Sequence, residues 1–338
     1  MNILEFEFDK IKGAAATLLS PGAILSLPQL AVAFGLAFTI LALRRRSRRG
    51  AVRPRALLRA IFAKKLIFNR SVGADLIYFG INTFVIVSLV GWGIFSGAEI
   101  ADFVTGALTR IFGEPSRSTA PVWALRAGMT VVAFLSYEFG YYVDHWLKHR
   151  IPALWELHKT HHTAEVLNPL TVFRVHPLDT LIFVDIVAVC GGVFHSVYTY
   201  AIGQPIDTYT VAGTNALLVM FFFLVSHLQH SQFWLPLTGW AGRLVLSPAH
   251  HQLHHSADPQ HFNTNFGSFI AIFDWMFGTL YVPQKESPRL KFGAAELGED
   301  PHSITALLID PVVKSLAALG LKAPERKPAP SETASPGL

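Results

Sequence analysis

Histidines at short, repeated spacings are the residues of this 338-residue chain best suited to chemistry. They form one HxxxH motif and two HxxHH motifs: His145 and His149; His158, His161 and His162; and His251, His254 and His255. On an α-helix, residues three and four apart share a face, so each motif predicts imidazoles that point together. Neutral imidazole is a good ligand for iron, zinc or copper. The motifs therefore predict metal binding.

The number of imidazoles predicts more than one ion. Eight nitrogens exceed the four positions of a tetrahedral zinc site, so two metals are the natural interpretation. A lone histidine would be read as a surface residue, but two HxxHH motifs are hard to attribute to chance. His230, at the end of an apolar segment, is predicted as a ninth ligand. His176, His227 and His250 are further candidates, with an interfacial or bystander role as the alternative.

Long apolar segments must position these motifs. The chain is 51% hydrophobic and only 15% charged, which is typical of a membrane protein. Five segments approach the roughly 20 residues that cross a bilayer: 21–43, 75–97, 121–143, 178–203 and 209–227. The fourth is the weakest candidate because it contains Asp179, Asp185 and His195. We expect an all-α, multi-pass helical membrane protein with a cytosolic, histidine-rich helical cap.

Charge distribution predicts the orientation. Of the 28 Lys and Arg residues, eleven lie between Arg44 and Arg70, where no acidic residue occurs. Such a basic loop beside an apolar segment marks the cytoplasmic side and argues against nucleic-acid binding. Counting crossings from this loop places the three motifs on the cytoplasmic side. The single cysteine, Cys190, excludes an intrachain disulfide and a cysteine-based metal site.

The order HxxxH, HxxHH, HxxHH resembles the fatty acid hydroxylase superfamily, which includes sterol desaturases. Other stretches resemble family positions: Phe173 to Pro177, Gln229 to Ser231, Ser247–Pro248, Asn265 to Gly267, and Phe273 to Thr279. The resemblance covers roughly 122–283. It departs at Trp275, where the family often has arginine. Of the adjacent His250 and His251, only the latter gives HxxHH spacing.

The resemblance implies a helical membrane domain that binds two iron ions through histidines and uses O2 to hydroxylate or desaturate a fatty acyl chain or sterol. The resemblance supports the catalytic domain (122–283) alone. The apolar segments and the composition predict the rest of the division: an anchor with a basic loop (1–74), a second membrane segment with an external loop (75–121), and a C-terminal extension with a disordered tail (284–338). The chain has no CxxCH haem motif and no GxGxxG motif between a strand and a helix. We therefore expect a ferredoxin or cytochrome, with its NAD(P)H-dependent reductase, as the electron donor.

Two alternatives remain open. Membrane desaturases and alkane hydroxylases also use eight or more histidines, although the segments around Asn265 to Gly267 and Phe277 to Thr279 favour the hydroxylase side. A zinc transporter or another non-catalytic metal-binding membrane protein is the alternative from a different class. Transporter ligands lie near the bilayer midplane, whereas these motifs lie beyond the predicted span ends. Of the possible membranes, we favour the bacterial inner membrane.

Overall fold

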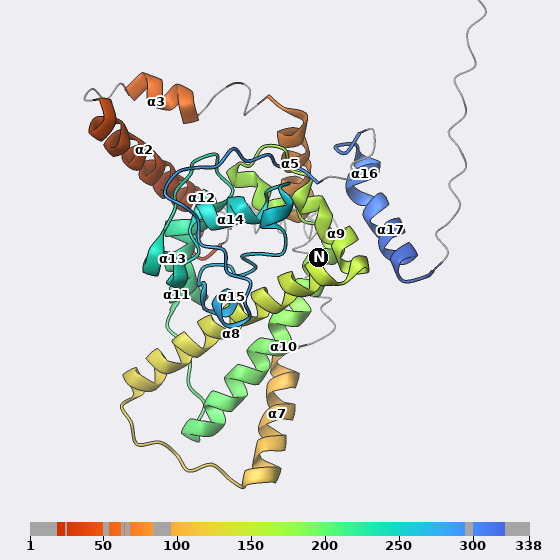
Figure 1. Ribbon diagram of the computed structural model, residues 1–338. Coiled ribbons are helices and arrows are strands. Elements are labelled where there is room, and N and C mark those ends of the chain that lie inside the picture. The colour runs from red at the N-terminus through yellow and green to blue at the C-terminus, as the bar shows by residue number, and fades with distance from the viewer. Residues whose placement is uncertain are drawn as a thin grey trace, which may run out of the picture.

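Helices make up most of the structure, a computed structural model that describes residues 19–23, 26–49, 54–61, 64, 68–83, 96–294 and 300–321 (Figure 1). The longer helices are α2 (Leu27–Arg49), α5 (Arg70–Ile81), α7 (Gly97–Phe112), α8 (Val122–Arg150), α9 (Pro152–His162) and α10 (Pro177–Ile202). The shorter helices are α3 (Pro54–Ile61), α11 (Ala216–Phe221), α12 (His227–Gln229), α13 (Gly239–Leu244), α14 (Pro248–His254), α15 (Ile272–Met276), α16 (Ile304–Leu308) and α17 (Asp310–Ala318). Three single turns complete the elements: η3 (Pro169–Phe173), the π-helical η4 (Phe222–Ser226) and η5 (Pro259–His261).

Helix α10 packs against both α7 and α8, and these three helices extend away from the short helices that carry most of the histidines (Figure 1). Small residues permit the close approach. A Cβ atom at Gly192 of α10 would lie 2.7 Å from the carbonyl oxygen of Gly97 on α7. A Cβ atom at Gly128 of α8 would collide with the Tyr198 side chain, whose hydroxyl donates to the Leu125 carbonyl. The three helices form a rigid stem that ends at the first histidine motif.

Two of the described helices are long and apolar enough to cross a membrane, namely Leu27–Arg46 within α2 and the whole of α10. They correspond to the first and fourth predicted segments. The fourth is therefore a better candidate than its acidic residues suggested, since Asp179 is buried in the first turn of α10 against Lys148. The third segment forms most of α8, which continues through the first motif and carries charged residues such as Arg126 and Glu138.

The fifth predicted segment, 209–227, is helical only in part. Its beginning forms an antiparallel hairpin of β1 (Thr210–Val211) and β2 (Thr214–Asn215). Ala212 and Gly213 have φ angles of 49° and 80°, which suit a tight hairpin turn. The helical stretch Ala216–Gln229 then rises roughly 21 Å, less than the ~30 Å of a bilayer core. This segment is therefore shorter than the predicted span.

Two predicted regions fall partly outside the described residues. The second segment, 75–97, begins in α5, but 84–95 are not described. The predicted external loop after it is wrong for 97–112, which form α7, because Ser96 caps this helix and its apolar face packs on α10. The predicted disordered tail lies outside the described residues after 321. The described part of the C-terminal extension contains α16 and α17, and α17 packs on α9.

Candidate metal centre

Three helices and one short turn carry the clustered histidines. His145 and His149 lie on the last turns of α8, the second motif ends α9, and the third occupies α14 with His255 as its C-cap. His230 is the C-cap of α12. A proline begins both α9 and α14, at a helix position that needs no N–H donor. Short helices thus begin and end where they bring the histidines of separate motifs close together.

The structure gathers nine imidazoles into two clusters. Cluster A contains His145, His149, His158, His162 and His254, and cluster B contains His161, His230, His251 and His255. Within each cluster, the nitrogens able to bind a metal all lie within 4.8 Å of one another. These nine residues are the main ligands predicted from the sequence. Their convergence is observed, whereas metal binding by them stays a prediction.

Each HxxHH motif contributes to both clusters. In the second motif, His158 and His162 belong to cluster A, whereas His161 between them belongs to cluster B. The third motif is also divided, but in the opposite sense: His251 and His255 belong to cluster B, and His254 belongs to cluster A. Residues four apart share a helix side, while the adjacent residue points about 100° away. The expectation that all histidines of a motif point together therefore holds only for the four-apart pairs.

The imidazoles of cluster A present unpartnered acceptors. All five Nε2 atoms are buried and have no hydrogen-bond partner among the described residues. His145 donates its Nδ1–H to the Phe266 carbonyl, and His254 donates to the Thr264 carbonyl, both at 2.8 Å. These bonds leave Nε2 unprotonated and available to a metal. Each buried acceptor without a donor costs about 1–3 kcal/mol, so five together indicate a cation site.

Cluster B shows the same convergence through short nitrogen–nitrogen distances. The Nε2 atom of His230 lies 3.2 Å from that of His161 and 2.8 Å from that of His251, which lies 3.1 Å from that of His255. The Nδ1–H of His161 donates to the Arg174 carbonyl at 3.3 Å, which leaves Nε2 of the same ring unprotonated, with its lone pair available. Nitrogens bound at about 2.0–2.1 Å to one ion lie about 3 Å apart. This is the spacing expected around one shared ion, and an N–H···N hydrogen bond between neighbouring imidazoles has the same length.

Burial keeps these rings neutral, as metal binding requires. Burial and the neighbouring imidazoles lower the pKa of His161 and His162 well below the usual value. Burial lowers the pKa of both His230 and His254 to about 3. Neutral imidazole suits iron, copper and zinc, and five- and four-membered clusters fit two ions. The residues present therefore fit a pair of transition metals.

The loop 264–267 orients two rings of cluster A through its carbonyl groups. Asn265, between Thr264 and Phe266, adopts a left-handed φ of 58°, and the carbonyl groups on either side of it each accept from a cluster A imidazole. The Asn265 amide donates to the Tyr281 carbonyl at 3.1 Å and accepts from the Tyr281 N–H at 2.8 Å. Asparagine tolerates this backbone region better than most residues. The asparagine of the Asn–Phe–Gly stretch thus has a local structural role.

Asp274 anchors the same loop. Its carboxylate accepts hydrogen bonds from the Phe266 N–H at 2.7 Å, the Gly267 N–H at 2.8 Å and the Thr279 hydroxyl at 2.7 Å. Asp274 is fully buried. The aspartate therefore fixes the Phe266 carbonyl that orients His145.

A buried ion-pair network supports His158. Lys148, which is 3% exposed, pairs with Asp144 Oδ2 at 2.6 Å and with both Oδ1 and the carbonyl of Asp179. Asp179 Oδ2 accepts the Nδ1–H of His158 at 3.1 Å. Burial raises the pKa of Asp144 to about 7, and the Lys148 ammonium opposes that rise. The network links α8, α9 and α10 beneath the clusters.

Arg174 orients His161 of cluster B through its backbone carbonyl and is itself held by a buried guanidinium. Its guanidinium is completely buried and donates to Asp75 of α5 at 3.2 Å, Thr163 at 2.8 Å and His302 at 2.8 Å. Its own carbonyl accepts from His161. Arginine in this setting joins α5, the end of α9 and the C-terminal segment. The orientation of one cluster B ring therefore depends on residues far apart in the sequence.

The three further candidates lie outside both clusters. Each uses a ring nitrogen in another contact: His176 with the Leu308 carbonyl (3.1 Å), His227 with the Gln29 side chain (3.2 Å), and His250 with the Gly242 carbonyl (3.0 Å). The Nδ1 atom of His227 is buried and has no partner among the described residues. Glu138, which precedes the first motif on α8, accepts from the backbone N–H groups of Phe269 and Ile270 and not from an imidazole.

Sequence reasoning missed the supporting roles of Lys148, Arg174, Asp179 and Asp274. For Asp179 a signal was available, because a charged residue at the edge of an apolar segment requires a partner. Arg174 gave a weaker signal, as an arginine beside His176 and Pro177. The carbonyl partners Thr264 and Phe266 gave none, since backbone groups carry no sequence signature.

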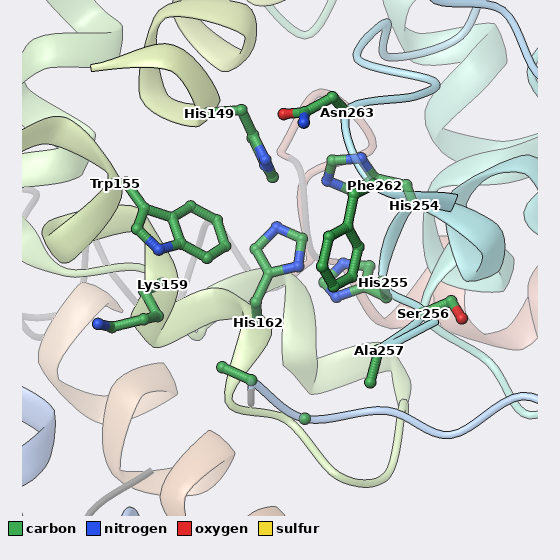
Figure 2. Close-up of a pocket in the computed structure, with 12 residues that line it drawn as sticks. His149, Trp155, Lys159, His162, His254, His255, Ser256, Ala257, Phe262 and Asn263 are labelled. Carbon is green, nitrogen blue, oxygen red and sulfur yellow. The ribbon is translucent and has the colours of Figure 1, made fainter. Parts of the chain in front are cut away.

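Two separate cavities, with no lining residue in common, reach both clusters. One, of about 340 Å³, is lined by four cluster histidines together with Trp155, Lys159 and Phe262. Figure 2 shows His149, His162 and His254 around it, with Trp155 and Lys159 on one side and Phe262 on the other. The other, which we name the aromatic cavity, measures about 310 Å³ and lies against α8 and α10. Its lining includes Tyr137, Tyr141, Phe173, Phe183, and the cluster residues His145, His158, His161 and His230.

Residues 130–279 match the family model described as fatty acid hydroxylase. All nine clustered histidines lie within this range. This region belongs to the fatty acid hydroxylase superfamily. The resemblance of the motifs is thereby confirmed, and the hydroxylase region contains α8 to α15 except for the first turns of α8.

Curated relatives support this assignment. The chain is 26% identical over 155 residues to alkylglycerol monooxygenase of Xenopus tropicalis, covering 46% of this chain and 31% of that protein. It is 27% identical to ornithine lipid hydroxylase OlsE of Rhizobium tropici, covering 48% and 44%. It is 29% identical to very-long-chain aldehyde decarbonylase GL1-6 of Oryza sativa subsp. indica, covering 49% and 25%. The alignments span less than half of each relative, and no solved structure matches.

Metal-free protein should lose stability as pH falls below about 6.5. Unfolded histidines titrate near pH 6.5, whereas folded His230 and His254 stay neutral down to about pH 3. Between these values the unfolded chain binds more protons, so the free energy of unfolding decreases by up to about 1.4 kcal/mol per pH unit for each histidine. Thermal unfolding in chelator at pH 7.5 and 5.5 measures this. His230→Gln should weaken the dependence, and His195→Gln, at an exposed position, should not; equal midpoints at the two pH values would contradict the prediction.

Replacing Asp274 by alanine should loosen the loop 264–267. The substitution leaves two backbone N–H groups and the Thr279 hydroxyl without their acceptor, so we expect a loss of about 3 kcal/mol or more in the free energy of unfolding. Asp258→Ala is the control, because Asp258 only caps the short turn η5. We expect about 1 kcal/mol for the control. Similar losses in chemical unfolding of the two variants would contradict an anchoring role.

Proposed function

We propose that this chain is a membrane-bound di-iron oxygenase that hydroxylates a lipid with O2 and external electrons. The observation that carries the proposal is the pair of imidazole clusters, whose unpartnered nitrogens lie beside an aromatic cavity. Cluster A would hold one iron and cluster B the other. Bound there, iron would supply oxygen-dependent oxidation of a C–H bond.

The comparisons favour hydroxylation. Relatives carry the names alkylglycerol monooxygenase and ornithine lipid hydroxylase, both of which denote oxygen insertion into lipids. Iron is preferred over zinc because zinc has no redox chemistry to offer such a reaction. A fatty acyl or alkyl chain is therefore the proposed substrate portion, with a sterol as the other possibility within the superfamily.

The aromatic cavity suits a lipid chain. Tyr141 of α8 and Phe183 of α10 form part of its wall, and α10 is a candidate membrane helix. A hydrocarbon chain can reach it sideways from the bilayer without crossing water. The apolar wall would exclude water from the reacting carbon, while His145 and His161 line the end nearest the metals. The protein's task is then to hold the chain at a fixed position relative to the clusters.

Placement and partners extend the proposal. The basic run between Arg44 and Arg70 supports a multi-pass topology with a cytoplasmic active site, and we favour the bacterial inner membrane. Electrons would come from a ferredoxin or cytochrome with an NAD(P)H-dependent reductase. The competing hypothesis, a zinc transporter, places its ligands near the midplane of the spans. Here, cluster residues lie at the last turns of α8 and on the short helices beyond it.

Iron content of detergent-purified protein tests the metal assignment. We expect about two iron ions per chain in the wild type by elemental analysis. His158→Ala removes a cluster A ligand and His161→Ala a cluster B ligand, so each variant should lose about half of the iron or more. His195→Ala, outside both clusters, should retain the wild-type value. Wild-type protein that folds in supplemented medium and binds no transition metal would rule out the oxygenase.

Filling the aromatic cavity should block lipid oxidation without removing iron. Val172 lines this cavity, so Val172→Trp should reduce lipid-dependent oxygen consumption by about tenfold or more, because displacement of the reacting carbon is costly to the rate. Val197→Trp is the matched control, since Val197 of α10 is half-exposed and does not line the aromatic cavity. An oxygen electrode with membrane lipid extract and a reductase measures the rate. Unchanged turnover in Val172→Trp would refute this cavity as the lipid site.

A further inference from the structure

The aromatic cavity contains a buried hydrogen-bond acceptor that the protein leaves unused. Asp144 lines the cavity, is 4% exposed, and uses Oδ2 to pair with Lys148 at 2.6 Å. Its other oxygen, Oδ1, is buried and has no donor in the described part of the chain. Asn82 lines the same cavity, and its side-chain oxygen also lacks a donor among the residues described. Both residues line the cavity together with Tyr137, Tyr141 and Phe183.

The nearest donor group is already saturated. An ammonium has three N–H donors. Those of Lys148 face Asp144 Oδ2, Asp179 Oδ1 and the Asp179 carbonyl. No further proton on Lys148 can serve Asp144 Oδ1. Leaving a carboxylate oxygen buried without a donor is more costly than leaving a neutral acceptor. The ligand of this cavity is therefore the natural source of the missing donor.

We infer that the lipid bound in the aromatic cavity carries a hydroxyl or amide N–H group, which donates to Asp144 Oδ1 and fixes the neighbouring carbon beside the histidine clusters. The inference rests on the proposed function, because it takes the lipid bound in this cavity to be the substrate of the oxygenase. A neutral donor fits better than an ammonium group, because the Lys148 ammonium already lies beside Asp144 and over the Phe183 ring, and a second cation there would be repelled. Asp144 lines the same cavity as His145 and His158, so a group bound to it lies in the cavity that reaches cluster A.

The substitution Asp144→Asn should abolish the preference of the site for a hydroxyl. In the variant, the amide oxygen must face the Lys148 ammonium, because an NH2 group there would oppose like donors. The NH2 group then faces the position of Oδ1 and presents a donor where the wild type presents an acceptor. The hydroxyl proton of a ligand loses its charged acceptor, whereas a hydroxyl oxygen and an ether oxygen can both accept from the NH2 group. Loss of the discrimination with binding retained separates hydrogen bonding from simple loss of structure.

A binding competition with two matched probes tests the inference. Purified full-length protein, kept anaerobic and without reductant, binds tritiated 1-tetradecanol in a scintillation proximity assay. Unlabelled 1-tetradecanol and 1-methoxytetradecane are the competitors, which differ by replacement of the hydroxyl proton with a methyl group. Comparing the ratio of their affinities between protein variants removes the effect of partition into detergent.

We expect the wild type to prefer the alcohol by about tenfold to a hundredfold, the range for a hydrogen bond to a charged group. Asp144→Asn should bind the two probes about equally, and Asp258→Asn, outside the cavity, should match the wild type. A wild-type ratio near one overturns the inference whether or not the variant folds, and so does an alcohol preference retained in Asp144→Asn. No turnover occurs in the assay, so failure of the oxygenase would appear only in the iron and oxygen measurements.

Discussion

The convergence of nine imidazole nitrogens is the constraint on which the rest of the structure depends. In cluster A all five Nε2 atoms are buried without a partner among the described residues, an arrangement that folding alone does not favour. Protein groups bind the opposite nitrogen of His145, His158, His161 and His254, and thereby set the tautomer. The clusters make sense as a prepared ligand shell, and the surrounding hydrogen bonds hold that shell in place.

The supports of this shell come from distant parts of the chain. Asp274 fixes the loop 264–267, whose carbonyl groups orient two rings, and Arg174 connects His161 to α5 and to His302. His302 lies beyond the hydroxylase region at 130–279. The C-terminal segment, with α17 packed on α9, is therefore part of the scaffold that positions the second histidine motif.

The nine histidines that converge in the structure could be selected from the sequence because helical spacing is a local property. His145, His149 and their seven counterparts were identifiable from motif spacing and from the position of His230 alone. The division of each HxxHH motif between two clusters was not predictable, since it depends on which side of α9 or α14 faces the other helices. The backbone carbonyl acceptors and the hairpin at 210–215 were not predicted either, the latter because its apolar flanks resemble a longer span. Within the part of the chain that the structure describes, α2 and α10 are the predicted spans that form helices of sufficient length and hydropathy.

The use of imidazole alone has an electrical consequence. Histidine ligands bring no charge, so two divalent ions would place four positive charges in a buried region. The ion-pair network below them, with two carboxylates and one ammonium, offsets only a single unit of that charge. Such a field disfavours the loss of further electrons by the metals. A centre of this kind would have a higher reduction potential than one bridged by carboxylates, and would rest in its reduced form until a counter-anion or an oxidant arrives.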